Sequence, residues 1–319
     1  MKPRPSSISA SELTWALALL VVALVLLDAA GGWFLRSIHP RSTVNPVYKA
    51  MRDDPHTLIL GGSTIKYSLD PAILGGGAYN AGQDGQTLFF AASFLRGIPR
   101  DGGTRRIIFG LAPHDFAAGA DSMLLKYLKT LSVFAVDDPL LLDQLSRADP
   151  LIKLKYLSSL YPFQGRARRT IFEWLWPNPP DNGFQALISE SDPAPAVRSR
   201  RTEPLPIPKE SLLWLDQFIE TSEQLGLQIV FTVPPWVHEP NQASQPRYAK
   251  VMAAIRERMR GRDFCDLTAE TPPEIERIAH DTSYFYDRQH LNDRGARVFS
   301  EVVSRQLKAY CGPVGKGPL

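Results

Sequence analysis

Two polar side chains near the C-terminus, Asp287 and His290, have the spacing of an acid–base pair. On a tight turn or a first helical turn, side chains three positions apart lie on the same face. Asp287 can therefore hold one imidazole nitrogen while the other points outward. The alternative is a capping or surface pair without chemistry. As an acid–base pair, these residues would form half of a catalytic triad.

The missing half would be an activated hydroxyl or thiol, and Ser63 is the best candidate. It follows the apolar run Thr57–Leu60 and the pair Gly61-Gly62. Glycine lets the backbone turn sharply and lets a substrate carbonyl approach. The amide of Ser63 can then face a developing oxyanion. Taken alone, Gly-Gly-Ser also fits an ordinary turn.

A third short block, NAGQDGQT from Asn80 to Thr87, lies between the other two. In this order the blocks resemble the SGNH (GDSL-like) hydrolase superfamily over roughly residues 55–310. The resemblance implies that Ser63 is the nucleophile, His290 the base and Asp287 the orienting carboxylate. It also implies that the backbone amides of Ser63 and Gly85 bind the oxyanion. An ordinary glycine turn is the alternative at Gly85.

Within that superfamily, the chain is most similar to membrane-anchored members linked to acyl transfer on extracellular polysaccharides and teichoic acids. The resemblance implies an acyl donor, a glycan acceptor and an integral-membrane acyltransferase partner. The expected reaction is acyl transfer, such as O-acetylation, or ester hydrolysis. The triad does not separate these two outcomes.

One part of the superfamily pattern is absent. A Gly-x-Asn-Asp block usually supplies a third oxyanion donor, but this sequence reads Gly110-Leu111-Ala112-Pro113-His114-Asp115. Losing such a donor can lower turnover about a hundredfold or more. A non-catalytic glycan-binding or scaffold protein that keeps the fold therefore remains the alternative, although the polysaccharide-modifying relatives also tend to lack this block.

Three further residues are candidates for the pocket: Asn80, His114 and Trp236. Trp236 follows a predicted strand and could stack on a sugar ring, but core or rim packing explains it equally well. His114 also follows a strand, where a local hydrogen-bonding role is the plainer interpretation.

Alternating strand and helix patterns predict the fold. Short apolar runs typical of buried strands occur at Thr57–Leu60, Arg106–Leu111, Leu227–Val233 and Asp263–Leu267. Helical patterns occur between and after them at Leu88–Leu95, Lys209–Leu225, Ser244–Arg260 and Asp293–Tyr310. This order predicts an α/β protein with a central parallel sheet between helices. The resemblance implies the three-layer, flavodoxin-like form of that fold.

The N-terminal region predicts a membrane anchor. Leu13–Leu27 is apolar except for Thr14, and with Asp28 tolerated the segment reaches Leu35. About 20 residues are needed to span a bilayer. The small residues Ala29-Ala30-Gly31 also fit a cleaved signal peptide. Both interpretations export the rest of the chain, and the first predicts a single-pass protein of the inner (cytoplasmic) membrane with a periplasmic catalytic domain.

We therefore expect four parts along the chain: a cytoplasmic tip and anchor at 1–36, a linker at 37–54, a catalytic domain at 55–312 and a tail at 313–319. A helical and proline-rich insertion is expected at about 116–210, including helical stretches at Met123–Phe134, Pro139–Leu145 and Leu151–Leu160. No internal repeat stands out.

Composition limits the other function classes. A formal charge of +3 over 319 residues, with no basic run interleaved with aromatics, argues against nucleic-acid binding. The histidines and the two cysteines show no metal-ligand spacing, so no metal or other cofactor is expected. Cys265 and Cys311 can form a disulfide outside the cytosol or remain separate buried thiols.

Overall fold

The computed structural model describes residues 9–39, 49–50, 53–112, 116, 139–177, 182–188 and 207–312. The chain divides into two compact units. The first contains Met1–Val44 and Leu128–Pro177, and the second contains Asn45–Tyr127 and Asn178–Leu319. The predicted triad residues all belong to the second unit.

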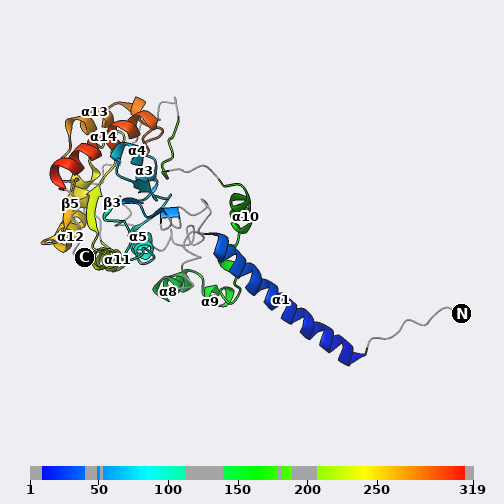
Figure 1. Ribbon diagram of the computed structural model, residues 1–319. Helices are drawn as coiled ribbons and strands as arrows, with labels where there is room; N and C mark the ends of the chain where they lie inside the picture. The colour runs from blue at the N-terminus through cyan, green and yellow to red at the C-terminus, as the bar shows by residue number, and fades with distance from the viewer. Residues whose placement is uncertain are drawn as a thin grey trace. The chain divides into compact units, whose positions relative to one another are not determined.

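A five-stranded parallel sheet forms the centre of the second unit (Figure 1). Its strands are β1 (Thr57–Gly61), β2 (Ala78–Asn80), β3 (Arg106–Gly110), β4 (Gln228–Thr232) and β5 (Phe264–Asp266). The spatial order β2-β1-β3-β4-β5 is that of flavodoxin-like folds. The predicted α/β architecture is confirmed. The sequence patterns did not predict β2, because three residues are too few to show a period.

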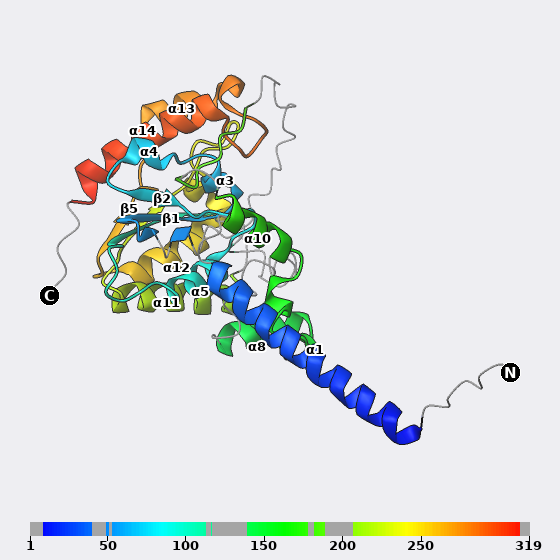
Figure 2. The ribbon, with the colours of Figure 1, turned by 45° about the vertical axis from the view of Figure 1, so that its right-hand side comes forward.

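Helices cover both faces of the sheet (Figure 2). One face carries α3 (Ser63–Lys66), α4 (Pro71–Leu74), α13 (Pro273–Ala279) and α14 (Asp293–Tyr310). The other carries α5 (Leu88–Leu95), α11 (Lys209–Gln224) and α12 (Ala249–Met259).

Strand side chains alternate between these two layers, as the pleat requires. Ile59 and Ile108 are buried with Phe299 of α14 in one core cluster. Phe109 instead meets Phe218 of α11, at a ring-centroid distance of 5.4 Å. Burying each such side chain contributes roughly 1.5–3 kcal/mol. The sheet is therefore held from both sides, which fixes where its strand ends lie.

Helix boundaries follow local signals. Asn292 caps α14 by accepting a hydrogen bond from the amide of Gly295 at 3.0 Å. The predicted bounds of α5 and α14 are confirmed. The predicted helix at Ser244–Arg260 instead begins at Ala249, after two 3₁₀ turns. Pro246 explains the difference, because a proline disfavours helical geometry in the residue before it.

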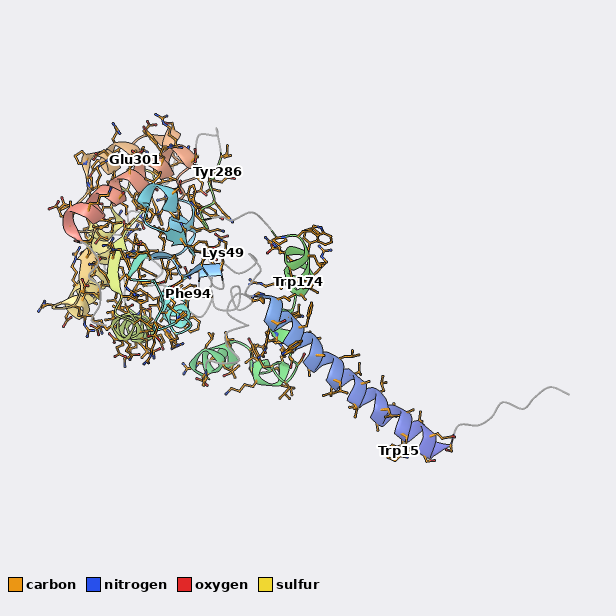
Figure 3. The ribbon with its side chains drawn as sticks, viewed as in Figure 1. Trp15, Lys49, Phe94, Trp174, Tyr286 and Glu301 are labelled. Atoms are coloured by element: carbon orange, nitrogen blue, oxygen red, sulfur yellow. A yellow bond between two sulfur atoms is a disulfide. The ribbon has the colours of Figure 1, made fainter. Side chains whose placement is uncertain are left out.

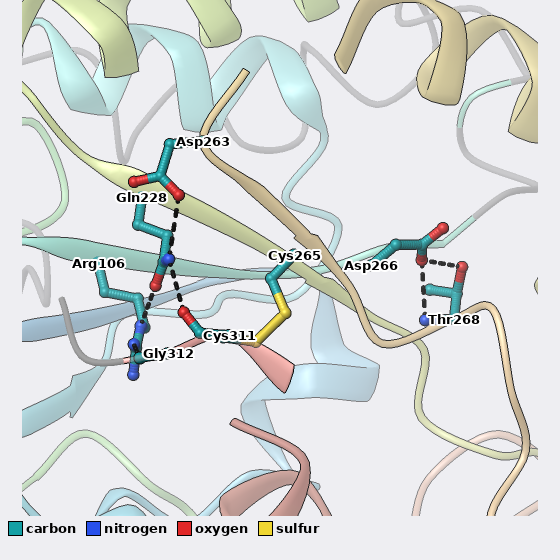
Figure 4. Close-up of a disulfide and its surroundings, with 8 residues drawn as sticks. All are labelled: Arg106, Gln228, Asp263, Cys265, Asp266, Thr268, Cys311 and Gly312. Atoms are coloured by element: carbon teal, nitrogen blue, oxygen red, sulfur yellow. Dashed lines mark hydrogen bonds between the residues drawn. A yellow bond between two sulfur atoms is a disulfide. The ribbon is translucent and has the colours of Figure 1, made fainter. Parts of the chain in front are cut away.

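A disulfide joins β5 to the end of α14 (Figure 4). The Cα atoms of Cys265 and Cys311 are 5.4 Å apart. Beside it, the side-chain amide of Gln228 donates to the carbonyl oxygen of Cys311 at 2.9 Å. Of the two alternatives for the cysteines, the structure therefore has the pair, and the pair ties the last helix to the edge of the sheet.

The first unit is helical. It contains α1 (Ala10–Ile38), α8 (Pro139–Ala148), α9 (Ile152–Lys155), the 3₁₀ turn η2 (Tyr161–Phe163) and α10 (Ala167–Leu175). Helix α1 has 29 residues and a mean hydropathy of 2.4 over its most apolar window, which is enough to cross a membrane. The predicted helix at Met123–Phe134 lies outside the described residues.

The segment 151–160 differs from its prediction as one continuous helix. Only the single turn α9 forms, and the chain then bends. The carboxylate of Asp28 in α1 accepts hydrogen bonds from the backbone amides of Ser159 and Leu160, at 2.6 and 3.4 Å. These amides are thereby drawn out of the helical hydrogen-bond ladder.

Candidate active site

Ser63 lies at the carboxyl end of the sheet, at the point where the strand order reverses. It is the first residue of α3 and follows β1 through Gly62. Strand β1 lies between β2 and β3, and ligands of flavodoxin-like sheets bind at this switch point. The first amide of a helix has no partner within that helix. The backbone of Ser63 is therefore placed to donate to a ligand.

Asp287 and His290 lie in a tight turn that precedes α14. One carboxylate oxygen of Asp287 accepts hydrogen bonds from the backbone amides of Gln289 and His290, at 2.8 and 2.9 Å. The amide of Tyr286 donates to the carbonyl oxygen of His290 at 2.9 Å and closes the turn. Of the two geometries considered for the pair, the structure has the turn.

The three predicted triad side chains come together. The second carboxylate oxygen of Asp287 is 2.8 Å from His290 Nδ1, and His290 Nε2 is 2.8 Å from Ser63 Oγ. An ionised carboxylate only accepts hydrogen bonds, so Nδ1 must donate to it. Nε2 then carries a lone pair, and the Ser63 hydroxyl donates to it. This arrangement can take the proton from an attacking serine.

The charge state of Asp287 suits an orienting role. Partial burial alone would raise the pKa of this carboxyl. The hydrogen bond from His290 and the amides of Gln289 and His290 outweigh the burial, so the pKa falls below its ordinary value. Asp287 is therefore ionised at neutral pH and favours a protonated imidazole when one forms.

An aromatic side chain, Tyr67, supports the imidazole. Its ring meets the ring of His290 edge to face, at a centroid distance of 5.5 Å. Lys66 Nζ lies 4.7 Å from the centre of the Tyr67 ring and 3.3 Å from a carboxylate oxygen of Asp84. The sequence interpretation did not identify Tyr67. Its position four residues after Ser63 was the available signal, since one turn of helix brings such residues to the same face.

Two glycines let α3, the helix that begins at Ser63, approach the sheet. Gly61 and Gly110 lie opposite each other in the β1–β3 register, and Ile65 of α3 packs against both. A Cβ on Gly110 would overlap the Ile65 side chain. Gly61 has a φ of 137°, a conformation that other residues rarely adopt. Its amide donates to the side-chain oxygen of Gln86 at 2.7 Å, a contact that the sequence did not reveal.

Gly85 lies at the third position of a turn in which the amide of Gln86 donates to the carbonyl oxygen of Gln83 at 3.0 Å. Its φ of 70° is the left-handed conformation that a type II turn requires at that position. The turn geometry therefore explains why position 85 is a glycine. Its role as an oxyanion donor stays a prediction.

The three pocket candidates have different positions. Asn80 is 1% exposed, and its side-chain amide donates to the carbonyl oxygens of Ile65, Lys66 and Leu69. It therefore holds α3 in place instead of facing a ligand. Trp236 is 6% exposed, which leaves little ring surface for stacking on a sugar. His114 lies outside the described residues.

A pocket lies beside the carboxyl end of β3. Its described lining is mostly apolar and includes Gln86, Thr87, Leu88, Leu111, Ala112 and Trp214. Gly110, which lies opposite Gly61 in the β1–β3 register, also lines it. Gln86, one of the lining residues, directly follows Gly85 in the sequence. Among the residues that the structure describes, no cluster of three or more His, Cys, Asp and Glu side chains could hold a metal.

The chain matches no protein-family model and no curated protein. A solved structure described as "a putative platelet activating factor from Streptococcus pneumonia" is similar at 12% identity and a TM-score of 0.38. That similarity covers 93% of this chain and 98% of the other.

Proposed function

We propose that this protein transfers an acyl group through Ser63, as an acyltransferase or an esterase of the SGNH type acting on an extracytoplasmic polysaccharide. The observation that carries the proposal is the pair of 2.8 Å contacts linking Ser63 Oγ to His290 Nε2 and His290 Nδ1 to Asp287. These contacts provide a nucleophile, a base and an orienting carboxylate in hydrogen-bond reach.

In the first half of the proposed reaction, Ser63 Oγ attacks the acyl carbonyl carbon while His290 Nε2 takes the hydroxyl proton. Asp287 stabilises the imidazolium. The amides of Ser63 and Gly85 donate to the oxyanion. Collapse of the tetrahedral intermediate breaks the bond to the leaving oxygen, which receives the proton from His290. The product is an acyl-serine and a free alcohol.

In the second half, an acceptor hydroxyl gives its proton to His290 and attacks the acyl-serine. The new ester or acid leaves, and Ser63 regains its proton. Water as acceptor makes the protein an esterase, and a sugar hydroxyl makes it an acyltransferase. The small apolar pocket at Leu88 and Leu111 would receive a short acyl chain such as acetyl. The long apolar helix α1 favours an acyl donor delivered at a membrane.

The first experiment is p-nitrophenyl acetate turnover by the full-length protein in detergent. Ser63→Ala and His290→Ala are expected to lower kcat/KM by about a thousandfold or more, because each removes a member of a cooperative unit. Ser283→Ala and His280→Ala are matched controls, since both residues are exposed and lie outside the triad. Equal turnover in all five proteins would exclude Ser63 as the nucleophile.

A second assay separates transfer from hydrolysis. An acetyl donor is supplied with an added glycan, and both the glycan and free acetate are analysed by mass spectrometry. Acetyl on the glycan supports the transferase, and free acetate alone supports the esterase. Glycan binding without either product would instead establish the non-catalytic alternative, which the absent asparagine near Ala112 favours.

A further inference from the structure

Helix α1 changes character at Asp28. Every residue from Ala10 to Leu27 is exposed in the structure. From Asp28 onward, one face packs against the rest of the first unit, with Gly32, Leu35 and Ile38 buried. These positions recur every three or four residues, which is one side of a helix. The stretch from Ala10 to Leu27 can therefore contact lipid on all sides.

The segment 151–160 is fastened to α1 at this boundary. The hydroxyl of Ser158 donates to Asp28 at 2.5 Å, and the amide of Ser159 donates to the same carboxylate at 2.6 Å. A Cβ on Gly32 would overlap the backbone of Ser159. The segment 151–160 and α1 therefore pack closely at Gly32, where only a residue without a side chain fits. Cleavage after Ala30 would remove Asp28 from this contact, so the packing favours a retained anchor.

The segment turns leucines outward. Leu151, Leu154 and Leu157 are 59%, 64% and 78% exposed, and they recur every three residues from the start of α9 into the turn that follows it. Lys153 and Lys155 alternate with them, and their ammonium groups form ion pairs with Asp143 and Asp149 of the same unit. Such a row has no evident function in water, where exposed apolar surface is unfavourable.

The depth of the row follows from its attachment. Trp15 and Trp33 are both exposed and are separated by about 27 Å of helix rise, close to the roughly 30 Å of a bilayer's apolar core. Exposed tryptophans commonly mark the two membrane interfaces. Asp28 lies about 7.5 Å before Trp33 along the helix axis. A segment bonded to Asp28 is therefore held about one helical turn inside the interface that Trp33 marks, within the roughly 5–10 Å to which interfacial segments enter the bilayer. Figure 3 shows Trp15 at one end of α1 and Trp174 of α10 near the other.

We propose that residues 151–160 form a second membrane contact, in which Leu151, Leu154 and Leu157 enter the lipid interface beside α1. The occupant is the lipid bilayer itself, and the attraction is burial of the leucines in its apolar edge. The contact would hold the first unit against the membrane surface and limit its tilt. The inference rests on α1 spanning a membrane and does not depend on Ser63 chemistry.

The test uses the full-length protein in lipid nanodiscs of phosphatidylcholine and phosphatidylglycerol. Both native cysteines are in the disulfide, so a single introduced cysteine can be labelled selectively. Leu157→Cys would carry an environment-sensitive fluorophore. Leu213→Cys on α11 is the matched control, because Leu213 is also an exposed leucine but belongs to the second unit.

The label at 157 is expected to shift to shorter emission wavelength, and lipids with a spin label near the headgroup should quench it several-fold more strongly than the label at 213. Equal emission and equal quenching at the two positions would overturn the proposal. That result would leave a protein partner as the occupant of the leucine row. Because the label replaces an exposed side chain, both proteins should fold.

A second variant tests the attachment. Asp28→Ala in the Leu157→Cys protein is expected to reduce the quenching, because the segment loses its bonds to the helix. Unchanged quenching would contradict the role of Asp28 in setting the depth of the row.

Discussion

At the scale of single residues, the orientation of His290 depends on more than Asp287. The carboxylate fixes the imidazole along one edge through a 2.8 Å hydrogen bond, and the Tyr67 ring meets it edge to face. Lys66 and Asp84 in turn surround Tyr67. The proposed base is thus held by one polar and one aromatic contact, and the aromatic contact can be tested separately.

Tyr67→Ala is expected to lower kcat about tenfold or more with a small change in KM, because a misplaced base slows the chemical step more than binding. Tyr67→Phe keeps the ring and should restore most of the rate. Steady-state kinetics on p-nitrophenyl acetate provides the measurement. A rise in KM alone, or a phenylalanine variant as slow as the alanine variant, would show that the ring does not position His290.

At the scale of elements, the placement of Ser63 depends on how closely α3 packs over the ends of β1 and β3. Gly110 leaves the space that the Ile65 side chain fills, and Asn80 binds three carbonyl oxygens of the same short helix and the turn after it. A helix of four residues has little stability of its own. Its position is set by these contacts.

Gly110→Ala should therefore displace α3 and move Ser63 away from His290. The expected loss of unfolding free energy is about 1–3 kcal/mol, as for other overpacked cores. Esterase activity per folded molecule should also fall, because Ser63 no longer lies in reach of His290. Wild-type activity in this variant would mean that α3 does not need its close approach to the sheet.

The disulfide is a second element-scale constraint. It joins residues separated by 46 positions and fixes the end of α14 to β5. Reduction is expected to lower the free energy of unfolding by about 2–4 kcal/mol. Urea denaturation with and without reductant measures this difference. The Cys265→Ser, Cys311→Ser double variant should match the reduced protein and show no response to reductant. Equal stability of oxidised and reduced wild type would contradict the expectation.

At the scale of the whole molecule, long periodic segments could be predicted and tertiary contacts could not. Leu88–Leu95 and Asp293–Tyr310 have the predicted bounds because an apolar run and an asparagine cap define them locally. Strand β2 was missed because it has three residues and takes its partners from β1. The prediction of a helix at 151–160 was wrong because the hydrogen bonds that interrupt it come from Asp28, which is far away in the sequence.

The same division applies to the site. Asp287 and His290 could be paired from their spacing alone, because both lie in one turn. The contact of His290 with Ser63 joins residues 227 positions apart, so predicting it required the family resemblance as well as the motifs. Asn80 lies within a recognised block, yet its burial under α3 depends on the assembled sheet. The only signal for Tyr67 was its position four residues after Ser63, and Gln86 gave none.

The first unit should respond to acid through His39. Burial, with a smaller effect from Arg166, lowers the pKa of this side chain from 6.5 to about 4. The unfolded chain then binds the proton more readily than the folded one, so stability is complete above pH 6.5 and falls as the pH drops towards 4. Thermal unfolding followed across this range measures the slope. His39→Gln should flatten it, and an unchanged slope in that variant would rule out His39 as its source.

The most direct measurement of the proposed nucleophile is fluorophosphonate labelling of the full-length protein, followed by peptide mass spectrometry. The probe should attach to Ser63 alone among the serines. His290→Ala should slow the attachment about a hundredfold or more, because the hydroxyl loses its base. Labelling of a different serine, or equal labelling rates in wild type and His290→Ala, would contradict serine catalysis at this site.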